Sequence, residues 1–171
     1  MVSDKISNMD TGKKKPYAIL VFGAPMSGKT TFAEHFSESI NAPFLNLSKL
    51  EKEFKVSQKL EIELVNQFAK SKATIIIEGH LDTEAERKEI RDILDKAGYK
   101  TVVVWVQTDL NAIKQRMRHA YKSLDRAKAV LSASYEHIEA PTAEERPLVI
   151  SGKHTYQTQC KNVINRLPEY A

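Results

Sequence analysis

One octapeptide constrains this chain more than any other feature. Residues 23–30 read GAPMSGKT, which fits the phosphate-binding pattern G-x-x-x-x-G-K-[ST], and they follow directly on the apolar run 17–22. Phe32, Phe36 and Ile40 then recur every four residues, which predicts one face of an amphipathic helix. A chance match in a glycine-containing turn is the alternative, but it would not come framed by a strand and a helix. The sequence therefore predicts a phosphate-binding loop between the first strand and the first helix.

The loop has the chemistry that a polyphosphate needs. Backbone N–H groups, a helix N-terminus and one point cation hold such an anion, and the loop supplies all three. Lys29 would reach the β- and γ-phosphates, Thr30 would ligate Mg²⁺, and Thr31 is free to bond the α-phosphate. The predicted ligands are a nucleoside triphosphate, ATP, and Mg²⁺. The residues expected to bind the nucleotide here are Gly23, Ala24, Pro25, Met26, Ser27, Gly28, Lys29, Thr30 and Thr31.

Length and composition favour one globular domain in the cytoplasm. The chain has 171 residues, of which 42% are hydrophobic and 28% charged, and no apolar stretch approaches the roughly 20 residues that span a bilayer. Cys160 is the only cysteine, which excludes a disulfide framework and a thiolate metal cluster. The net charge of +4 suits a polyanionic substrate without demonstrating nucleic-acid binding. We expect no membrane and no obligate protein partner, and a flexible leader over residues 1–15.

Strand and helix patterns alternate along the rest of the chain. Apolar, β-branched runs predict strands at 17–22, 43–47, 73–77, 101–106 and 147–150. Helical periodicity predicts helices after the loop and at 51–70, 83–97, 110–117, 123–137 and 156–167. Thr83 and Glu86 form a capping box, and Gly98 suits the end of the helix that follows. This alternation indicates an α/β fold with a parallel sheet and helices on both faces, spanning residues 16–171 as one domain.

Ligands of such sheets bind beyond the carboxyl ends of the strands, so the residues that follow each strand are candidates for the site. Glu78 ends the run 75–77 and is predicted to hold Mg²⁺ through water or to orient a nucleophile, the alternative being a cap on a neighbouring helix. His80 could contact substrate, although a histidine in a turn is more often a hydrogen-bonded spacer.

The densest basic region comes later in the chain. Arg116, Arg118, Lys122 and Arg126 lie within three turns of predicted helix, so several of them can converge on one side. Arginines at such a site stabilise the charge on a transferred phosphoryl group, and the alternative is an ordinary solvated helix face.

Together these motifs resemble the small P-loop kinases of the polynucleotide-kinase and zeta-toxin type. The residues that carry the resemblance span about 16–167: the phosphate loop, Ile77-Glu78-Gly79, Arg87 with Glu89 and Ile90, 110–118, and 135–144 before Val149-Ile150. The resemblance implies a three-layer P-loop NTPase fold with sheet order 2-3-1-4-5 and a small helical lid at about 117–138. It also implies that Arg116 lies against the nucleotide, that Arg118 or Arg126 touches the transferred group, and that the loop Ser151-Gly152-Lys153 lies near adenine.

The chain departs from that group at the second strand. Those kinases usually carry an aspartate there, which accepts the proton of the attacking hydroxyl, whereas the matching stretch here offers Ser48 or Lys49. Glu51, Glu53 or Glu78 could take over, or the acceptor could be an ionised phosphate that needs no base. We therefore expect an ATP-dependent kinase acting on a small molecule or a nucleic-acid 5′-end, with catalytic residues Lys29, Glu78, Arg118 and Arg126. The alternatives are a nucleotide hydrolase or switch, and a binding module without chemistry.

Overall fold

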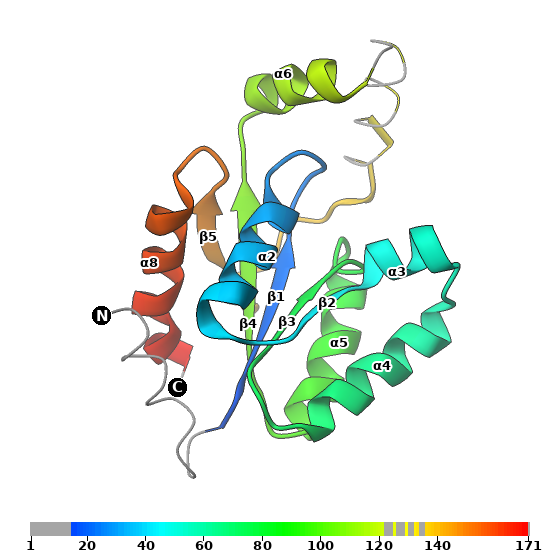
Figure 1. The fold of residues 1–171 in the computed structure, drawn as a ribbon, viewed down its shortest axis with the longest axis vertical. Helices are drawn as coiled ribbons and strands as arrows, with labels where there is room; N and C mark the ends of the chain where they lie inside the picture. Colours follow the sequence, from blue (N-terminus) through cyan, green and yellow to red (C-terminus); the bar gives the residue numbers. More distant parts are fainter. Residues whose placement is uncertain (1–14, 122–124, 126–128, 130–131, 134–135, 171) are drawn as a thin grey trace.

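The computed structural model describes residues 15–170 except 122–124, 126–128, 130–131 and 134–135. Within these residues the chain builds a five-stranded sheet in the order β2-β3-β1-β4-β5, in which every neighbouring pair is parallel (Figure 1). The strands are β1 Tyr17–Phe22, β2 Phe44–Asn46, β3 Ile75–Glu78, β4 Lys100–Gln107 and β5 Leu148–Ser151. The predicted α/β fold and its strand order are confirmed.

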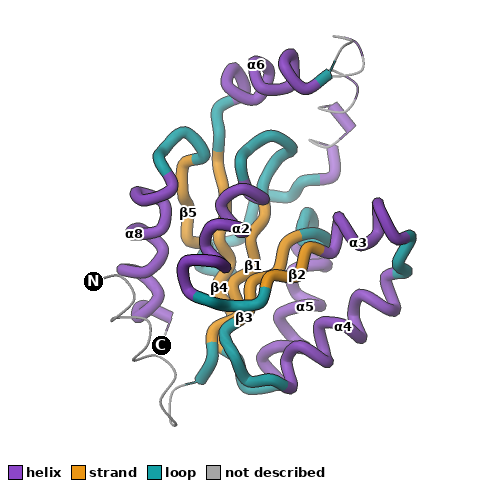
Figure 2. The backbone as a smooth tube through the Cα atoms, viewed as in Figure 1, coloured by secondary structure: helices purple, strands orange, loops and turns teal. Residues whose placement is uncertain are grey.

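Helices cover both faces of this sheet (Figure 2). The helices of the described residues include α2 Lys29–Ile40, α3 Leu47–Phe54, α4 Gln58–Lys70, α5 Glu84–Lys96, α6 Leu110–Ala120 and α8 Tyr156–Arg166, followed by the 3₁₀ turn η1 Leu167–Tyr170. Helices α2 and α8 pack on one face of the sheet, and α4 and α5 pack on the other. The site therefore rests on a scaffold of three layers.

The central strand β1 shows why a continuous apolar run folds into such a sheet. Successive side chains of a strand point to opposite faces, so a strand covered on both sides must be apolar throughout. All residues of β1 are buried. Ile19 and Val21 contribute to the core under α2 and α8, whereas Ala18 and Leu20 contribute to the core under α4 and α5. The loop that follows β1 is thereby anchored from both faces.

The single helix predicted at 51–70 is wrong, because the structure has two helices there. Helix α3 begins at Leu47, directly after β2, and the Asn46 side chain caps it by accepting a hydrogen bond from the Lys49 N–H at 2.9 Å. It ends where Lys55 takes a left-handed conformation with φ 55°. Ser57 then precedes α4. The left-handed Lys55 and the extended Ser57 thus interrupt a pattern that reads as one helix by its periodicity.

The local signals around α5 are confirmed. Thr83 and Glu86 form the reciprocal capping box, and Gly98 has φ 87° after the helix. The expected leader and much of the expected helix 123–137 lie outside the described residues, so the leader and the domain limits stay predictions. In the part of the chain that the structure describes, no helix has the length and apolar character needed to cross a membrane.

A buried ion pair ties α5 to the segment before β5. Arg87 is fully buried and donates to both carboxylate oxygens of Glu145, at 2.7 and 3.0 Å. The same guanidinium donates to the backbone carbonyls of Leu81, Asp82 and Glu139, and it lies 4.7 Å from the ring centre of Phe22. Burial raises the pKa of Glu145, but the hydrogen bonds from Arg87 and from the Thr142 N–H outweigh it and lower the pKa below its ordinary value.

Removal of the Glu145 charge should destabilise the fold strongly. In Glu145→Ala the Arg87 charge stays buried without its partner, which typically costs about 3–5 kcal/mol of unfolding free energy. Urea unfolding followed by circular dichroism measures this loss, and Glu144→Ala, at an exposed neighbour, is the matched control. Because the pKa of Glu145 is lowered by folding, its contribution is present above the unfolded pKa and declines as the pH falls through the folded pKa. A loss no larger than that of the control would contradict this account.

Candidate functional site

The loop between β1 and α2 leaves the helix N-terminus open to a ligand. Gly28 is the residue before the helix and has φ 98°, a conformation that side chains with a Cβ rarely adopt. No side chain caps this end of α2, and its first turn has no acidic residue. Unpaired N–H groups and the positive end of the helix dipole favour an anion at such a position. The predicted cradle is therefore compatible with the observed backbone.

Donors from other segments hold the outer side of the loop. Arg116 of α6 donates to the Met26 carbonyl at 2.8 Å and, through its second nitrogen, to the Gly152 carbonyl at 2.8 Å. Thr108 donates its hydroxyl to the Ser27 carbonyl at 2.8 Å. A Cβ at Gly152 would collide with the same Ser27 carbonyl. Thr108 before α6 and Arg116 within it thus fix the loop backbone from outside, and Arg116 also binds the turn after β5.

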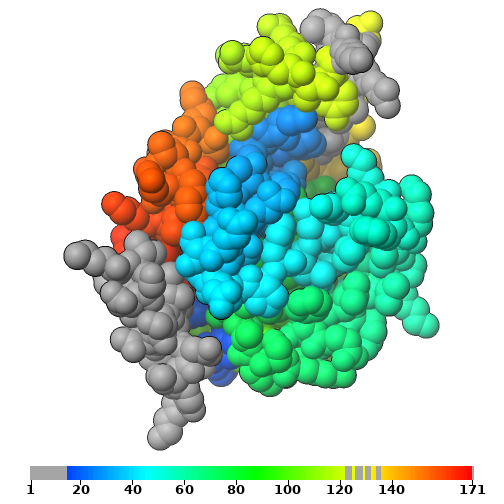
Figure 3. All heavy atoms as spheres, in the orientation of Figure 1, coloured from blue at the N-terminus to red at the C-terminus, as the bar shows by residue number. Residues whose placement is uncertain are grey.

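A cavity of about 530 Å³ extends from the loop along α2. Figure 3 shows the segments that line it, namely the loop with α2, helix α6 and the turn after β5, meeting on one face of the molecule. Its far end carries Tyr156, whose hydroxyl donates to the His35 carbonyl at 3.1 Å, and the two rings meet edge to face. The lining residues are Met26, Gly28, Lys29, Thr30, Thr31, Phe32, His35, Arg116, Gly152, His154, Tyr156 and Gln159.

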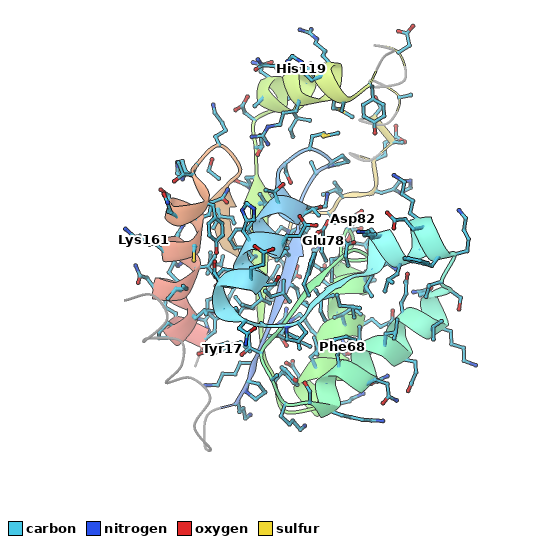
Figure 4. The ribbon with its side chains drawn as sticks, viewed as in Figure 1. Tyr17, Phe68, Glu78, Asp82, His119 and Lys161 are labelled. Atoms are coloured by element: carbon cyan, nitrogen blue, oxygen red, sulfur yellow. The ribbon has the colours of Figure 1, made fainter. Side chains whose placement is uncertain are left out.

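Glu78 lies where the end of β3 meets the start of α2. Its side chain is buried, and the Thr30 hydroxyl donates to one carboxylate oxygen at 2.8 Å (Figure 4). Asn46, its register partner on β2, donates its amide to the other oxygen at 3.4 Å. Burial is the largest influence on the pKa of Glu78 and leaves it raised, although the hydrogen bond from Thr30 and the charge of Lys29 lower it. A hydroxyl and a carboxylate side by side are the hard oxygen donors that fit Mg²⁺ with its retained waters.

The Lys29 side chain curls back over the loop, where its ammonium group makes a long hydrogen bond of 3.5 Å to the Ala24 carbonyl. Its charge acts on the pKa of both Glu78 and Asp82. One cation therefore faces the loop on one side and two carboxylates on the other.

His80 is held between two carboxylates. Its Nε2 lies 3.2 Å from Glu51 of α3, and its Nδ1 lies 2.6 Å from the buried Glu61 of α4. The Glu61 oxygens nevertheless have no donor with good hydrogen-bond geometry. His80 also has φ 50°, so the backbone is held in a conformation that histidine seldom takes. This arrangement favours the hydrogen-bonded spacer over the substrate contact.

The expected arginines are distributed unevenly. Arg116 reaches the loop, whereas Arg118 lies exposed on α6 and is not among the residues that line the cavity. Arg126 lies outside the described residues. Sequence reasoning also missed Asp82, which follows β3 closely, as well as His35 and Tyr156. No motif marks these residues, and only the packing of α8 against α2 brings the last two together.

A family of AAA domains matches residues 19–141, which is well over half of the chain. The chain belongs to this family. The matched range includes the phosphate-binding loop, Glu78 and α6. No curated protein matches the sequence.

Solved structures with the same fold include small P-loop kinases. A gluconokinase from Sinorhizobium meliloti 1021 is 17% identical, with a TM-score of 0.68 over 93% of this chain and 95% of that chain. The APS kinase CysC of Mycobacterium tuberculosis, in complex with AMPPNP and APS, is 16% identical, with a TM-score of 0.64 over 90% and 98%. The shikimate kinase of Aquifex aeolicus vf5 is 18% identical, with a TM-score of 0.52 over 90% and 96%. At these identities the likeness establishes that this AAA domain has the P-loop kinase fold.

The contribution of His80 to stability should depend on pH. Burial lowers the pKa of His80, but the hydrogen bond to Glu51 and the charge of Glu61 outweigh it, so the net shift is upward. A raised folded pKa means that the stabilisation is complete below the unfolded pKa of about 6.5 and is lost as the pH rises through the folded pKa. His80→Gln should therefore cost more unfolding free energy at pH 6 than at pH 8, by a few tenths to about 1 kcal/mol.

Urea unfolding of wild type and His80→Gln at both pH values measures this difference. His119→Gln, at an exposed histidine on α6, controls for the substitution itself. An equal loss at both pH values, or a larger one at pH 8, would show that protonated His80 does not connect the two carboxylates.

Proposed function

We propose that this chain is a Mg²⁺- and ATP-dependent kinase that moves the γ-phosphoryl group of ATP to a hydroxyl or phosphate acceptor. The observation that carries the proposal is the pairing of an uncapped α2 N-terminus with Thr30 and the buried Glu78 directly beside it. The first feature binds phosphate, and the second provides oxygen donors for the metal that accompanies it. Membership of the AAA domain family and the fold shared with small P-loop kinases support this proposal.

Each residue of the site has its own role in this proposal. The backbone N–H groups of the loop, which Pro25 lacks, and the Lys29 ammonium bind the phosphates, and Thr31 bonds the α-phosphate. Thr30 and Glu78 would hold Mg²⁺, Glu78 through water, and the metal would supply positive charge against the charge that develops on the phosphates. Lys29 needs only to leave the Ala24 carbonyl, a weak 3.5 Å contact, to face the γ-phosphate.

The cavity beside the loop suits the nucleoside. Adenine would lie toward Tyr156 and His35, whose ring faces and edges pack well against a planar base. The turn Ser151-Gly152 would border it, and Arg116 would lie against the nucleotide from α6.

The stretch 117–138 is proposed as a lid over the bound nucleotide. Closure would bring Arg118 or Arg126 to the transferred group, where an arginine lowers the barrier by on the order of 4–7 kcal/mol. The exposed position of Arg118 leaves it free to move inward with such a lid.

The solved structures that share this fold favour a small-molecule acceptor, because those named above are a gluconokinase, an APS kinase and a shikimate kinase. A nucleotide or a polynucleotide 5′-end remains within the proposal. The enzyme would work in the cytoplasm without an obligate protein partner.

Two other functions use the same loop. A nucleotide hydrolase or switch would release phosphate without an acceptor, and a binding module would hold nucleotide without turnover. Incubation of the purified chain with γ-labelled ATP and a panel of sugars, nucleosides, nucleotides and 5′-hydroxyl oligonucleotides separates these functions. Label on an acceptor supports the kinase, free phosphate alone supports the hydrolase, and bound nucleotide without either supports the module.

Lys29→Ala should abolish turnover and weaken the binding of ATP, because the γ-phosphate loses its cation. We expect a rate loss of at least about 100-fold, in line with the removal of one group that stabilises transition-state charge. Phosphate release measures the rate and calorimetry the affinity. Lys161→Ala on α8, far from the loop in Figure 4, is the matched control. Turnover that survives in Lys29→Ala would remove the loop from the mechanism.

Glu78→Gln should change the metal dependence of the reaction. The amide keeps the shape of the side chain but loses the charge that holds the metal and its waters. The magnesium concentration that gives half-maximal turnover should rise by on the order of tenfold, since the loss of an outer-shell partner typically costs 10–100-fold in metal affinity. A magnesium titration at saturating ATP makes this measurement. An unchanged midpoint with a lower maximal rate would assign Glu78 to acceptor chemistry instead.

A further inference from the structure

The residue at the end of β2 is the first candidate for the group that takes the proton of the acceptor. The residue that ends β2 and faces the site is Asn46, whose amide donates to Glu78 and whose oxygen caps α3. An amide does not accept a proton at neutral pH. The second strand therefore ends in a residue that positions its neighbours and cannot serve as a general base.

Two of the carboxylates that the sequence offers instead are already engaged. Glu51 pairs with His80 at 3.2 Å. Both oxygens of Glu78 accept hydrogen bonds, from Thr30 and from Asn46, and Glu78 is the proposed metal partner. Another carboxylate is thus more readily available to take the proton of the acceptor hydroxyl.

Asp82 is such a carboxylate, at the same end of the sheet. It follows β3 by four residues and lies next to Glu78 in Figure 4. Its charge acts on the pKa of Glu78, and the charge of Lys29 acts on that of Asp82, so the three groups share one locality. The Asp82 side chain is accessible to solvent, yet burial among the surrounding atoms is the largest cause that raises its pKa. A substrate can therefore reach the Asp82 carboxylate from solvent.

Hydrogen bonds and packing hold the backbone of Asp82 in place. The Asp82 carbonyl accepts hydrogen bonds from Arg87 at 3.1 Å and from the Glu139 N–H at 2.8 Å. Leu81 before it is buried, and Thr83 after it caps α5. A catalytic group needs this kind of support, because even a small displacement of a general base lowers the rate of the reaction.

We propose that Asp82 is the proton acceptor for a hydroxyl substrate that carries no phosphate of its own. This inference rests on the proposed kinase function and narrows its acceptor. The carboxylate that the related kinases carry after the second strand is replaced here by one after the third strand.

The step balances without any further reactant. The Asp82 carboxylate takes the proton of the acceptor hydroxyl, and the oxygen lone pair forms the new bond to the γ-phosphorus. The bond between that phosphorus and the β,γ-bridging oxygen breaks, and ADP leaves with the electron pair. Asp82 then returns its proton to solvent.

The charges around Asp82 favour an acceptor without a phosphate. Glu86 raises the pKa of Asp82, and Glu34 raises that of Glu78, so further carboxylates reach the same locality. Lys29, His80 and Arg87 oppose them by lowering the pKa of Asp82. Lys29 is committed to the γ-phosphate, however, His80 lies between Glu51 and Glu61, and Arg87 is paired with Glu145. A second phosphate beside these carboxylates would meet repulsion, whereas a neutral or cationic alcohol would not.

Calorimetry of the full chain with Mg·AMPPNP and Mg·ADP tests the position of Asp82 without any acceptor. Asp82→Asn should tighten AMPPNP binding about 3–10-fold and leave ADP binding within about twofold, because only AMPPNP places a γ-phosphate near the removed charge. Asp92→Asn, at an exposed aspartate of α5 paired with Lys88, should change neither affinity. An unchanged ratio of the two affinities in Asp82→Asn would overturn the proposal while the kinase function stands. Failure of the wild-type chain to bind either nucleotide would overturn the kinase function itself.

Transfer of labelled phosphoryl tests the chemistry. The probes are uncharged and cationic alcohols (nucleosides, hexoses, cyclitols and amino alcohols) and the monophosphates of the same compounds. We expect transfer to hydroxyl groups of the unphosphorylated set, slowed about 10²–10⁴-fold in Asp82→Asn although that variant binds the triphosphate at least as tightly as the wild type. Preferential transfer to the monophosphates, or a wild-type rate in Asp82→Asn, would overturn the proposal.

Discussion

The hydrogen bonds to the outer side of the phosphate-binding loop are the constraint on which the site depends. Arg116 of α6 donates to the carbonyls of Met26 and Ser27, and Thr108, which lies before α6, donates to the Ser27 carbonyl as well. The loop conformation is therefore fixed by protein donors before any ligand arrives. A backbone that needs no reorganisation on binding loses less free energy to ordering, and its N–H groups stay available to phosphate. The same Arg116 also fixes the Gly152 carbonyl, so one side chain joins the loop to the turn after β5.

The opposite side of the site is built on buried charge. Arg87 with Glu145 clamps the segment that carries Asp82, and His80 links the turn after β3 to Glu51 and Glu61 of helices α3 and α4. A buried ion pair such as Arg87 with Glu145 adds little net stability but is costly to break, so it imposes one arrangement on the chain. The proposed nucleotide side thus depends on backbone hydrogen bonds, and the proposed acceptor side on paired charges. This division agrees with a constant nucleotide and a substrate that differs between related folds.

The sequence predicts the elements whose signals are local and misses the contacts that span the chain. The position of the loop, strand β1 and the capping box of α5 each depend on residues within one short stretch, and all three are confirmed. The break between α3 and α4 is not predicted, because the left-handed Lys55 and the extended Ser57 outweigh helical periodicity there. The pairing of Arg87 with Glu145 joins residues 58 positions apart, and no local pattern indicates that these two residues meet. Asp82 was overlooked for the same reason, since only the folded chain brings it near Lys29.

Hydrogen–deuterium exchange of the whole chain, with and without Mg·ATP, tests the central claim that the turn between β1 and α2 is a preformed phosphate cradle. The account predicts that the nucleotide slows exchange at residues 23–31, where backbone amides meet the phosphates. It predicts no change in α4, which packs on the other side of the sheet from α2. Unaltered exchange at residues 23–31 under saturating nucleotide, or protection confined to other segments, would contradict it.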